Sequence, residues 1–375
     1  MNVLMYCLSS VSGGAVAYLR NLAPLLAKRF SLGENRLKFL LHEEQEPLFA
    51  GIEEASFSWI RGKRSKGAER IWWERKHMNR IVSEHNIDVL FTPYQIAAHV
   101  PDVRQVLMLR NMEPFLFDAY NYSITNWLRN QVLRQNSVRC LKKANRVIAV
   151  SGFAREHLVE KMGVDAERVR TIYHGSPDMQ FGAEKDMKIL SKYGIDSDYL
   201  FTCGSLLPYR RCEDIILAFA QCATKLKRDV QLVIVGSGTD QGYRRKLLQL
   251  IESSIVREQI LFLGQVSWET MTSLYRNCMA CIIATEIEAC PNIAIEAMAA
   301  GCAIISSDKP PLPEMFQRCS QEYKARNLNQ LAIKIQEVAD DSAWRQQLKE
   351  NARKRSERFS WGECALKTYD ALVNW

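Results

Sequence analysis

Short apolar runs alternate with longer amphipathic stretches along most of the chain, which indicates strands and helices in turn. In the first half, the predicted strands cover residues 3–7, 37–41, 88–91, 105–109, 146–150 and 169–174. Helical patterns lie between these runs. This alternation favours βαβ units, and therefore a parallel sheet with helices on both faces.

A second series of the same kind follows a polar segment at residues 175–188. Its predicted strands cover residues 199–203, 231–235, 260–263, 280–284 and 303–306. The tail at residues 359–375 has a helical pattern. The sequence therefore predicts an α/β protein with two doubly wound domains, residues 1–176 and 177–358, followed by a C-terminal helix.

The composition agrees with two globular domains, because 375 residues are long for a single core and the apolar and charged fractions are ordinary. The formal net charge of +8 favours an anionic partner, whether nucleic acid, anionic lipid or a phosphorylated small molecule. The eleven cysteines lack the spacing of a disulfide framework. This favours a reducing compartment, and we expect a cytoplasmic protein.

The N-terminal run MNVLMYCLSSVSGGA has two interpretations, a signal peptide or a buried first strand. A signal peptide begins with basic residues, which this run lacks, so we interpret residues 2–8 as a strand leading into a glycine turn. No stretch approaches the ~18 uncharged apolar residues of a membrane-spanning helix. We therefore expect any membrane contact to be peripheral.

The segment ACIIATEIEACPNIAIEAMAAGCAIISSD predicts a buried strand, a loop, a helix that starts near Pro291 and Asn292 and ends at Gly301, and another strand. The start of such a helix lies at the carboxyl end of a strand, where free backbone N–H groups attract phosphate. Glu296 would then reach a ribose attached to that phosphate. Glu288, in the preceding loop, would face the group beyond it.

Glu288 and Glu296, with seven residues between them and Ala-Met-Ala-Ala-Gly after them, resemble the E-x7-E motif of family 4 retaining glycosyltransferases of the GT-B fold. The resemblance implies that Glu296 holds the nucleotide ribose and that Glu288 contacts the donor sugar. It places Pro291, Asn292 and Ile293 at the donor. It also implies two Rossmann-like domains that face a cleft, with a C-terminal helix that returns toward the first domain.

The segment FTCGSLLPYRRCEDIILAF resembles the family's G-R-L-x-P-x-K motif, in which two basic side chains hold the diphosphate. Gly204 matches the glycine, Ser205 stands where arginine is usual, and Arg210 stands where lysine is usual, with Arg211 beside it. Arginine can hold phosphate with two parallel hydrogen bonds, so the pair can keep the positive charge. The alternative is a pair of solvated surface arginines.

Two further glycine turns match the same family. VIVGSG places Gly236 and Gly238 at a strand end, and without a third glycine it does not indicate NAD binding. LGQVSWETMTSLY resembles the loop that contacts the nucleobase, with Gly264 and Val266 near the ring. IYHGSPD and VSGFAREHL resemble the segments at and before the domain boundary, with His174 where asparagine is usual.

In the first domain, the paired Gly13 and Gly14 at a strand-to-helix turn would let backbone N–H groups approach the donor phosphates. A tight turn without a ligand is the alternative. Where many relatives carry histidine at the end of a later strand, this chain reads VLMLRNMEPF. Arg110 or Asn111 is therefore expected to contact the donor sugar or the acceptor.

The basic segment RGKRSKGAERIWWERKHMNR carries Trp72 and Trp73. A second basic series follows, and its members are Arg129, Arg134, Arg139, Lys142 and Lys143. Such segments suit an anionic membrane surface or a phosphorylated acceptor, and equally a solvated helix face with tryptophans in the core. Cys278 and Cys281 have the spacing of half a zinc or redox site, but without a partner pair we expect them to pack in the core.

The sequence therefore predicts a retaining, metal-independent glycosyltransferase of cell-surface polysaccharide or glycoconjugate synthesis. Its donor would be a nucleotide sugar such as a UDP- or GDP-sugar, its acceptor a glycan or a lipid-linked or other molecule, and it would need no separate cofactor. We expect no nucleic-acid partner, and peripheral contact at the inner face of the membrane. The alternatives are a GT-B sugar-nucleotide epimerase, a hydrolase that uses Glu288 and Glu296, or a non-enzymatic protein that binds polyanions.

Overall fold

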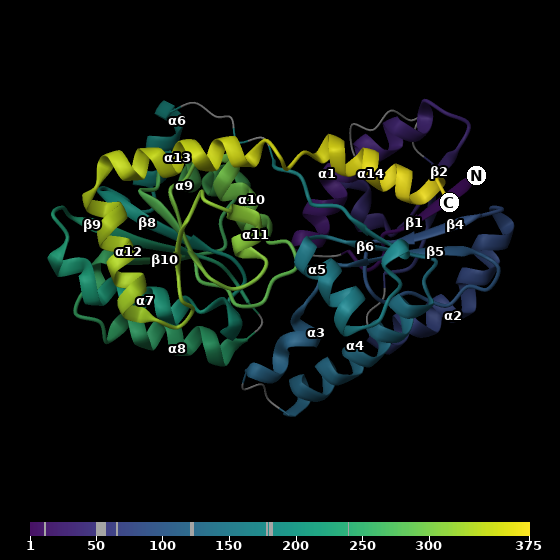
Figure 1. Cartoon of the computed structure of the whole chain (residues 1–375), viewed down its shortest axis with the longest axis horizontal. Helices are drawn as coiled ribbons and strands as arrows, with labels where there is room; N and C mark the ends of the chain where they lie inside the picture. The colour runs from purple at the N-terminus through teal and green to yellow at the C-terminus, as the bar shows by residue number, and fades with distance from the viewer. Residues whose placement is uncertain are drawn as a thin grey trace. The chain divides into compact units, whose positions relative to one another are not determined.

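The computed structural model describes residues 1–10, 13–49, 58–64, 67–120, 124–177, 179, 183–238 and 240–375. The chain forms two compact units. Unit 1 combines Met1–Gly175 with Phe359–Trp375, and unit 2 is Ser176–Arg358. Each unit is built on its own parallel sheet with helices on both faces (Figure 1).

The sheet of unit 1 has the strand order β3-β2-β1-β4-β5-β6-β7, with every neighbouring pair parallel. Its strands are β1 (Asn2–Tyr6), β2 (Arg36–Leu41), β3 (Trp59–Arg61), β4 (Val89–Thr92), β5 (Arg104–Leu109), β6 (Arg146–Ala149) and β7 (Val169–Thr171). In the register, Val3 of the central β1 lies between Leu37 and Val89. Strands covered on both faces are apolar at successive positions, and β1 accordingly reads Val-Leu-Met without alternation.

The helices of unit 1 are α1 (Gly14–Ser31), α2 (Gly67–Glu84), α3 (Glu113–Leu116), α4 (Ile124–Lys143), α5 (Gly152–Glu156) and α14 (Trp361–Val373). The last of these, α14, packs against α1 although more than 300 residues separate them in sequence. Gly175 permits this packing, because a Cβ atom there would overlap the backbone of Trp361. Arg146 fixes the other end of α14 by donating to the carbonyls of Ala371 at 2.8 Å and Asn374 at 2.7 Å.

The sheet of unit 2 has the order β10-β9-β8-β11-β12-β13 and is also parallel throughout. Its strands are β8 (Asp198–Cys203), β9 (Val230–Val235), β10 (Ile260–Gly264), β11 (Ala280–Ile283), β12 (Ile304–Ser307) and β13 (Gln321–Tyr323). Its helices are α6 (Ala183–Ser191), α7 (Cys212–Cys222), α8 (Gln241–Glu252), α9 (Trp268–Asn277), α10 (Asn292–Ala299), α11 (Leu312–Phe316), α12 (Leu328–Asp340) and α13 (Ser342–Ser356).

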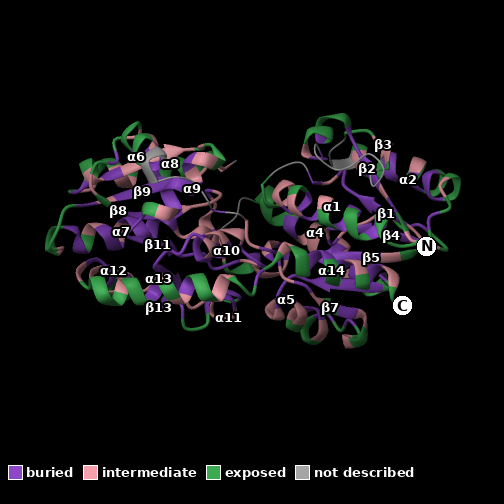
Figure 2. Ribbon diagram, turned by 90° about the horizontal axis from the view of Figure 1, so that it is seen from above, coloured by how far each residue is buried: buried purple, intermediate pink, exposed green. Residues whose placement is uncertain are grey.

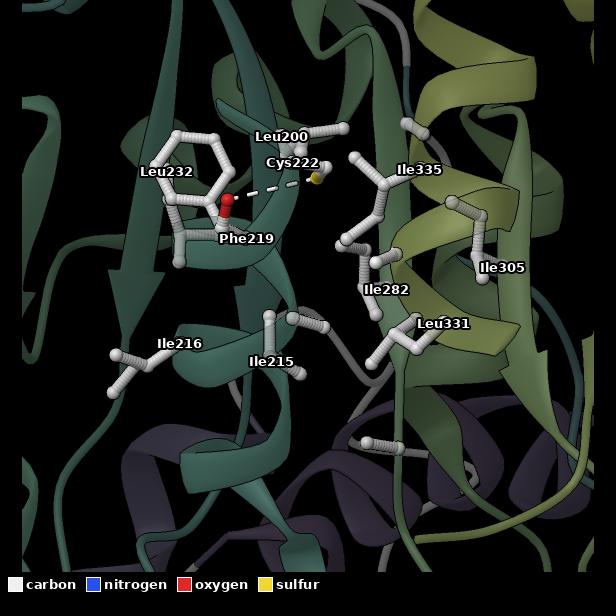
Figure 3. Packing of buried hydrophobic residues seen from close by; sticks show 14 of the residues in the cluster. Leu200, Ile215, Ile216, Phe219, Cys222, Leu232, Ile282, Ile305, Leu331 and Ile335 are labelled. Atoms are coloured by element: carbon white, nitrogen blue, oxygen red, sulfur yellow. Dashed lines mark hydrogen bonds between the residues drawn. The ribbon is translucent and has the colours of Figure 1, made fainter. Parts of the chain in front are cut away.

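One face of the unit 2 sheet packs on α7 and α12 through aliphatic side chains and Phe219 (Figure 3). Leu200, Leu232 and Ile282 from three strands share one cluster with Ile335 from α12, and all are at most 1% exposed. Burying each such side chain stabilises the fold by ~1.5 to 3 kcal/mol. Exposed positions gather on the outer sides of the helices (Figure 2). The core therefore fixes the strand ends from which the site loops project.

All eleven predicted strands form, with boundaries that differ by at most three residues. Residues 2–6 are β1, as the strand interpretation of the N-terminus predicts, and the tail forms α14. The sequence pattern does not reveal β3 and β13, which are three residues long and lie at sheet edges. Such short strands hold too few residues for a hydrophobic period to emerge.

Candidate active site

A pocket lies at the carboxyl edge of the unit 2 sheet, where β8, β9 and β11 end. About 340 Å³ of space, including its open mouth, is free of protein atoms there. Ligand sites in open parallel sheets occur at this edge. The pocket is lined by Thr202, Cys203, Gly204, Ser205, Leu206, Arg210, Cys212, Ile234, Val235, Ile283, Ala284, Thr285 and Ile293. Four of the predicted donor residues, Gly204, Ser205, Arg210 and Ile293, thus share one pocket.

The glycine turns at the ends of β8 and β9 are packed backbone against backbone. Gly236 donates to the carbonyl of Gly264 at 2.9 Å, and Gly204 donates to the carbonyl of Val235 at 3.1 Å. A Cβ atom at Gly236 would overlap the carbonyl oxygen of Gly204, and one at Gly238 would lie 2.6 Å from that of Leu206. These glycines are therefore needed to bring the loops together, whether or not a ligand is bound.

Arg210 and Glu288 form an ion pair beside this pocket, although 78 residues separate them in sequence. Arg210 ends the short 3-10 helix Pro208–Arg210 after β8, and Glu288 lies in the loop between β11 and α10. Their side chains are 21% and 11% exposed, so solvent screens the pair only in part. The fold thus brings the expected phosphate ligand and the expected sugar ligand into direct contact.

A backbone hydrogen bond and a second ion pair hold the two loops in register. The N–H of Glu286 donates to the carbonyl of Tyr209, the residue before Arg210, at 2.8 Å. The side chain of Glu286 is 3% exposed and accepts from Nε and Nη2 of Arg326 at 2.8 and 2.9 Å. Because Glu286 contacts the Arg210 loop and precedes Glu288 by two residues, it fixes both members of the ion pair relative to each other.

Arg211 differs from Arg210 in both backbone and partners. It adopts a left-handed conformation with φ of 53° at the start of α7. Its guanidinium donates to Asp214 through Nε at 2.9 Å and Nη2 at 2.7 Å, and its Nη1 lies 3.2 Å from Glu213. Arg211 is not among the pocket-lining residues. The geometry favours Arg210 as the phosphate ligand and gives Arg211 a role in anchoring the loop.

Glu296 is held by a tyrosine that the sequence patterns do not single out. The hydroxyl of Tyr275 donates to Oε2 of Glu296 at 2.9 Å, and the thiol of Cys203 lies 2.9 Å from the same hydroxyl. Because the Tyr275 proton is used toward the carboxylate, the Cys203 thiol is the donor in the second contact. The chain of contacts connects α10, α9 and the end of β8.

Burial raises the pKa of Glu296 from 4.5 to about 7, and the hydrogen bond from Tyr275 opposes this shift. A carboxylate is a stronger acceptor for ribose hydroxyls than a protonated carboxyl group. The carboxylate form of Glu296 is therefore populated increasingly as the pH rises through 7. Burial also raises the pKa of the Cys203 thiol to about 12, so this cysteine stays protonated and acts as a hydrogen-bond donor.

The helix α10 starts and ends where the sequence predicts. Pro291 occupies its N-cap position without a side-chain cap, and Asn292 and Ile293 form its first turn. Its first turn holds no acidic residue. The start of α10 therefore presents backbone N–H groups and the positive end of the helix dipole. Val266 lies in the partly exposed loop between β10 and α9, two residues after Gly264.

In unit 1, the predicted residues lie at the carboxyl edge of that unit's own sheet. Gly13 precedes α1 with φ of 55°, a backbone conformation that favours glycine, and Gly14 is the first residue of the helix. Arg110 and Asn111 directly follow β5. The backbone of Asn111 exchanges two hydrogen bonds with the buried side chain of Gln95, at 2.9 and 3.1 Å. The side-chain oxygen of Asn111 accepts from the N–H of Glu113 at 3.0 Å.

The two tryptophans of the basic segment have different environments. Trp73 is 8% exposed and packs in the core of unit 1, whereas Trp72 is 60% exposed, with the amine of Lys76 4.9 Å from the centre of its ring. Cys278 and Cys281 are buried, as the packing interpretation predicts. Within the described residues, no cluster of His, Cys, Asp and Glu could hold a metal ion, and no helix is apolar and long enough to cross a membrane.

Sequence analysis missed Tyr275, Glu286 and Arg326. Tyr275 occupies an apolar helical position, where an aromatic residue usually indicates core packing. Glu286 lies two residues before Glu288, and nothing in the pattern indicates its partner Arg326, which lies 40 residues later. Only the folded arrangement identifies these supporting contacts.

Two family models match successive parts of the chain. The model described as Glycosyltransferase Family 4 matches residues 12–177, and the one described as Glycosyl transferases group 1 matches residues 185–355. The first match lies in unit 1 and the second in unit 2. Together they contain all the predicted site residues.

Curated relatives and solved structures agree with these matches. The chain is 23% identical over 243 residues to the serotype-specific mannosyltransferase WbdA of Escherichia coli, covering 64% of this chain but only 30% of that protein. It is 20% identical to the O-antigen chain mannosyltransferase B of E. coli, covering 72% of this chain and 76% of that protein. The structure of Anabaena HepE in complex with UDP-glucose superposes with a TM-score of 0.78 at 17% identity, covering 99% of this chain and 100% of that chain.

Proposed function

The chain belongs to the family 4 glycosyltransferases of the GT-B fold, and on this premise we propose that it transfers a sugar from a nucleotide-sugar donor to a glycan or lipid-linked acceptor. The observation that carries this proposal is the pairing of Arg210 with Glu288 beside the unit 2 pocket. The fold holds a cation suited to a diphosphate and a carboxylate suited to sugar hydroxyls at one place. Since one relative is an O-antigen chain mannosyltransferase, we assign the reaction to cell-surface polysaccharide synthesis.

In this proposal, residues 177–358 hold the donor, residues 1–176 hold the acceptor, and residues 359–375 form the crossover helix. The donor diphosphate occupies the pocket beside Gly204 and Ser205. Glu288 contacts the sugar and Glu296 the ribose, while Gly264 and Val266 face the base. The assignment follows from the positions of these residues around the carboxyl edge of the sheet.

The main catalytic effect would be stabilisation of the departing diphosphate. Arg210 and the start of α10 would oppose the negative charge that develops on it. We further propose that the reaction retains the anomeric configuration: the acceptor oxygen attacks the face from which the diphosphate leaves, and its proton passes to a phosphate oxygen. Arg210 supplies positive charge, so a metal ion is not required in this scheme.

We propose a UDP- or GDP-sugar as the donor. HepE was crystallised with UDP-glucose, and two relatives are mannosyltransferases. Thermal unfolding with UDP, GDP and other nucleotides distinguishes the candidates, because a ligand at ~100 times its Kd adds ~2.7 kcal/mol to stability. If every nucleotide leaves the melting temperature unchanged, the donor site is wrongly assigned.

We also propose peripheral contact of unit 1 with anionic membranes. On α4, Ile124, Leu128 and Val132 follow one another at four-residue spacing and are more than half exposed, and exposed basic residues lie on the same helix. Apolar and basic side chains together suit an anionic bilayer surface. Sedimentation with anionic and neutral vesicles at rising salt tests this proposal. Equal binding to both vesicle types would contradict it.

Turnover assays separate the transferase from its alternatives. A transferase consumes donor in proportion to glycosylated product, an epimerase converts the donor without acceptor, and a hydrolase releases free sugar. Glu296→Ala is expected to weaken nucleotide binding in calorimetric titration while the melting temperature stays within the range of a surface substitution. Nucleotide affinity equal to wild type in this variant would contradict the ribose assignment, and duplex binding that survives free nucleotide would favour a polyanion-binding protein.

A further inference from the structure

Arg110 stands out among the arginines of unit 1 because it is half-buried and makes no short hydrogen bond within the described residues. Its guanidinium Nη1 donates only a long hydrogen bond, to the carbonyl of Pro93 at 3.5 Å. Its guanidinium otherwise lies over the ring of Tyr18, 5.7 Å from the ring centre. A guanidinium carries five N–H donors, so most of its hydrogen-bonding capacity is unused.

Other arginines of unit 1 show what a structural role requires. Arg146 also stacks on an aromatic ring, that of Trp375, but it makes two short bonds to backbone carbonyls. Arg155 donates to the carbonyl of Val169 at 2.9 Å and to that of Ala166 at 3.4 Å. Arg110 makes no bond of comparable length. No nitrogen of Arg110 is among the buried polar atoms without a hydrogen-bond partner, so its unused N–H groups are open to solvent and can meet a ligand.

The surroundings of Arg110 are positive or neutral. It follows β5 at the carboxyl edge of the sheet, and its ring partner Tyr18 lies little more than one turn into α1. The first turn of α1 holds no acidic residue, and its N-cap, Gly13, offers no side-chain cap. The positive end of the α1 dipole and the Arg110 guanidinium therefore belong to the same edge of the sheet. Burial lowers the pKa of Arg110, and no nearby carboxylate opposes this shift.

The backbone that carries Arg110 is rigid. The hydrogen bonds between Gln95 and Asn111 fix the residue directly after it, and Gln95 is fully buried. The guanidinium thus projects from a supported position, and a ligand would not need to order the loop on binding.

We propose that Arg110 is the centre of a phosphate-binding site in unit 1. This inference rests on the proposed function in one respect: the phosphate belongs to a substrate of the transfer, either the acceptor or the donor. An arginine with free N–H groups pairs with two phosphate oxygens at once. The site would then select substrates that carry a phosphate group close to the reacting end.

The direct test uses inorganic pyrophosphate as the probe, in calorimetric titration of the full chain. Arg210→Gln first removes the main cation of the unit 2 pocket. In that background, Arg110→Gln is expected to weaken pyrophosphate binding at least ~10-fold, the effect of losing a charge-assisted hydrogen bond. Arg155→Gln, a partly buried arginine of unit 1 with carbonyl partners, is the matched control and is expected to leave binding unchanged. Equal binding with and without Arg110 would overturn the proposal.

Thermal unfolding distinguishes this role from a structural one. Because no carboxylate loses a partner, Arg110→Met is expected to melt at or above the wild-type temperature. A clear decrease in the melting temperature would show that Arg110 supports the fold, and would count against the site. This readout needs no substrate, so it stands even if the transfer reaction is assigned wrongly.

Steady-state kinetics identifies which substrate supplies the phosphate. If the acceptor supplies it, Arg110→Gln raises the KM of a phosphate-bearing acceptor at least ~10-fold and leaves that of a phosphate-free analogue unchanged. If the donor supplies it, the KM of the nucleotide sugar rises and both acceptors respond alike. Unchanged KM values for both substrates would overturn the proposal. Loss of transfer in Arg210→Gln, measured beside it, reports separately on the proposed function.

Discussion

Each unit presents an arginine at the carboxyl edge of its own sheet, and the two arginines differ in their partners. Arg210 in unit 2 forms an ion pair with Glu288. Arg110 in unit 1 lies over the ring of Tyr18 and makes only a long hydrogen bond, to the carbonyl of Pro93. A ligand diphosphate at Arg210 must compete with a carboxylate that is already present. A ligand at Arg110 displaces only weak contacts. In the proposed function, binding of the diphosphate in unit 2 would therefore also release Glu288 for the sugar, and this coupling would have no counterpart in unit 1.

The largest expected effect concerns Arg211, the neighbour that anchors the Arg210 loop. Arg211→Ala leaves the buried carboxylate of Asp214 without its ion-pair partner and leaves Lys246 as the cation beside Glu213, so we expect the free energy of unfolding to fall by ~3 kcal/mol. Urea denaturation measures this loss. Arg210→Ala is the control, because its partner Glu288 is more exposed. If Arg211→Ala is as stable as wild type but loses catalysis, Arg211 is a phosphate ligand and the contrast with Arg210 disappears.

Arg210→Ala should affect the rate rather than the fold. A charged hydrogen bond to the departing diphosphate is worth ~1.5 to 3 kcal/mol, so we expect kcat to fall at least ~10-fold and more than the donor KM rises. Steady-state kinetics on Arg210→Ala and Arg211→Ala decides between them. A wild-type kcat in both variants would mean that the leaving group is stabilised elsewhere.

Glu288→Gln tests the competition directly. Without the carboxylate, Arg210 loses its ion pair with Glu288, and we expect a nucleoside diphosphate to bind ~5- to 10-fold more tightly, from the ~1 kcal/mol of a partly exposed ion pair. Transfer should fall, because the sugar loses its acceptor group. Calorimetric titration with UDP and GDP measures the affinity. An unchanged or weaker affinity would show that Glu288 does not oppose binding.

The smallest expected effect is a change in pH dependence. With the pKa of Glu296 at about 7, nucleotide affinity should decrease as the pH falls below 7, because the protonated group is the weaker acceptor. Tyr275→Phe removes a hydrogen bond that lowers this pKa, so the midpoint should move to higher pH, and Glu296→Gln should remove the dependence. The stability of the unliganded protein depends on pH in the opposite direction. Folding raises the pKa of the Glu296 carboxyl group, so stability falls as the pH rises from 4.5 to about 7. A midpoint that is unchanged in Tyr275→Phe would mean that Tyr275 does not control Glu296.

Sequence patterns predicted the two sheets because buried parallel strands are apolar at successive positions, and this signal does not depend on partners. They also indicated the helix that starts after Pro291, since proline, a glycine at the end and the flanking strands are local features. Arg210 and Arg211 could not be distinguished in this way. They are adjacent and chemically identical, and their roles follow from Glu288 and Asp214, whose positions only the fold decides.

The same limit applies to the tryptophan pair and to the basic segments. A helical period assigns Trp72 and Trp73 to neighbouring directions on α2, but it does not state which direction faces the sheet. The structure places Trp73 in the core and leaves Trp72 in solvent. The basic charges of this segment partly serve local ion pairs, such as that of Arg70 with Glu74, which a count of net charge does not reveal.

The packing of α14 on α1 sets an order of events during synthesis of the chain. Unit 2 is one continuous segment, whereas unit 1 needs Phe359–Trp375, which leave the ribosome after unit 2. Until then, the surface of α1 that packs against α14 has no cover, and Arg146 lacks its two carbonyl acceptors. Domains generally fold as units while the chain emerges. We therefore expect the second domain to be complete before the first, and ribosome-bound chains that stop before residue 359 to resist proteolysis in unit 2 but not in unit 1.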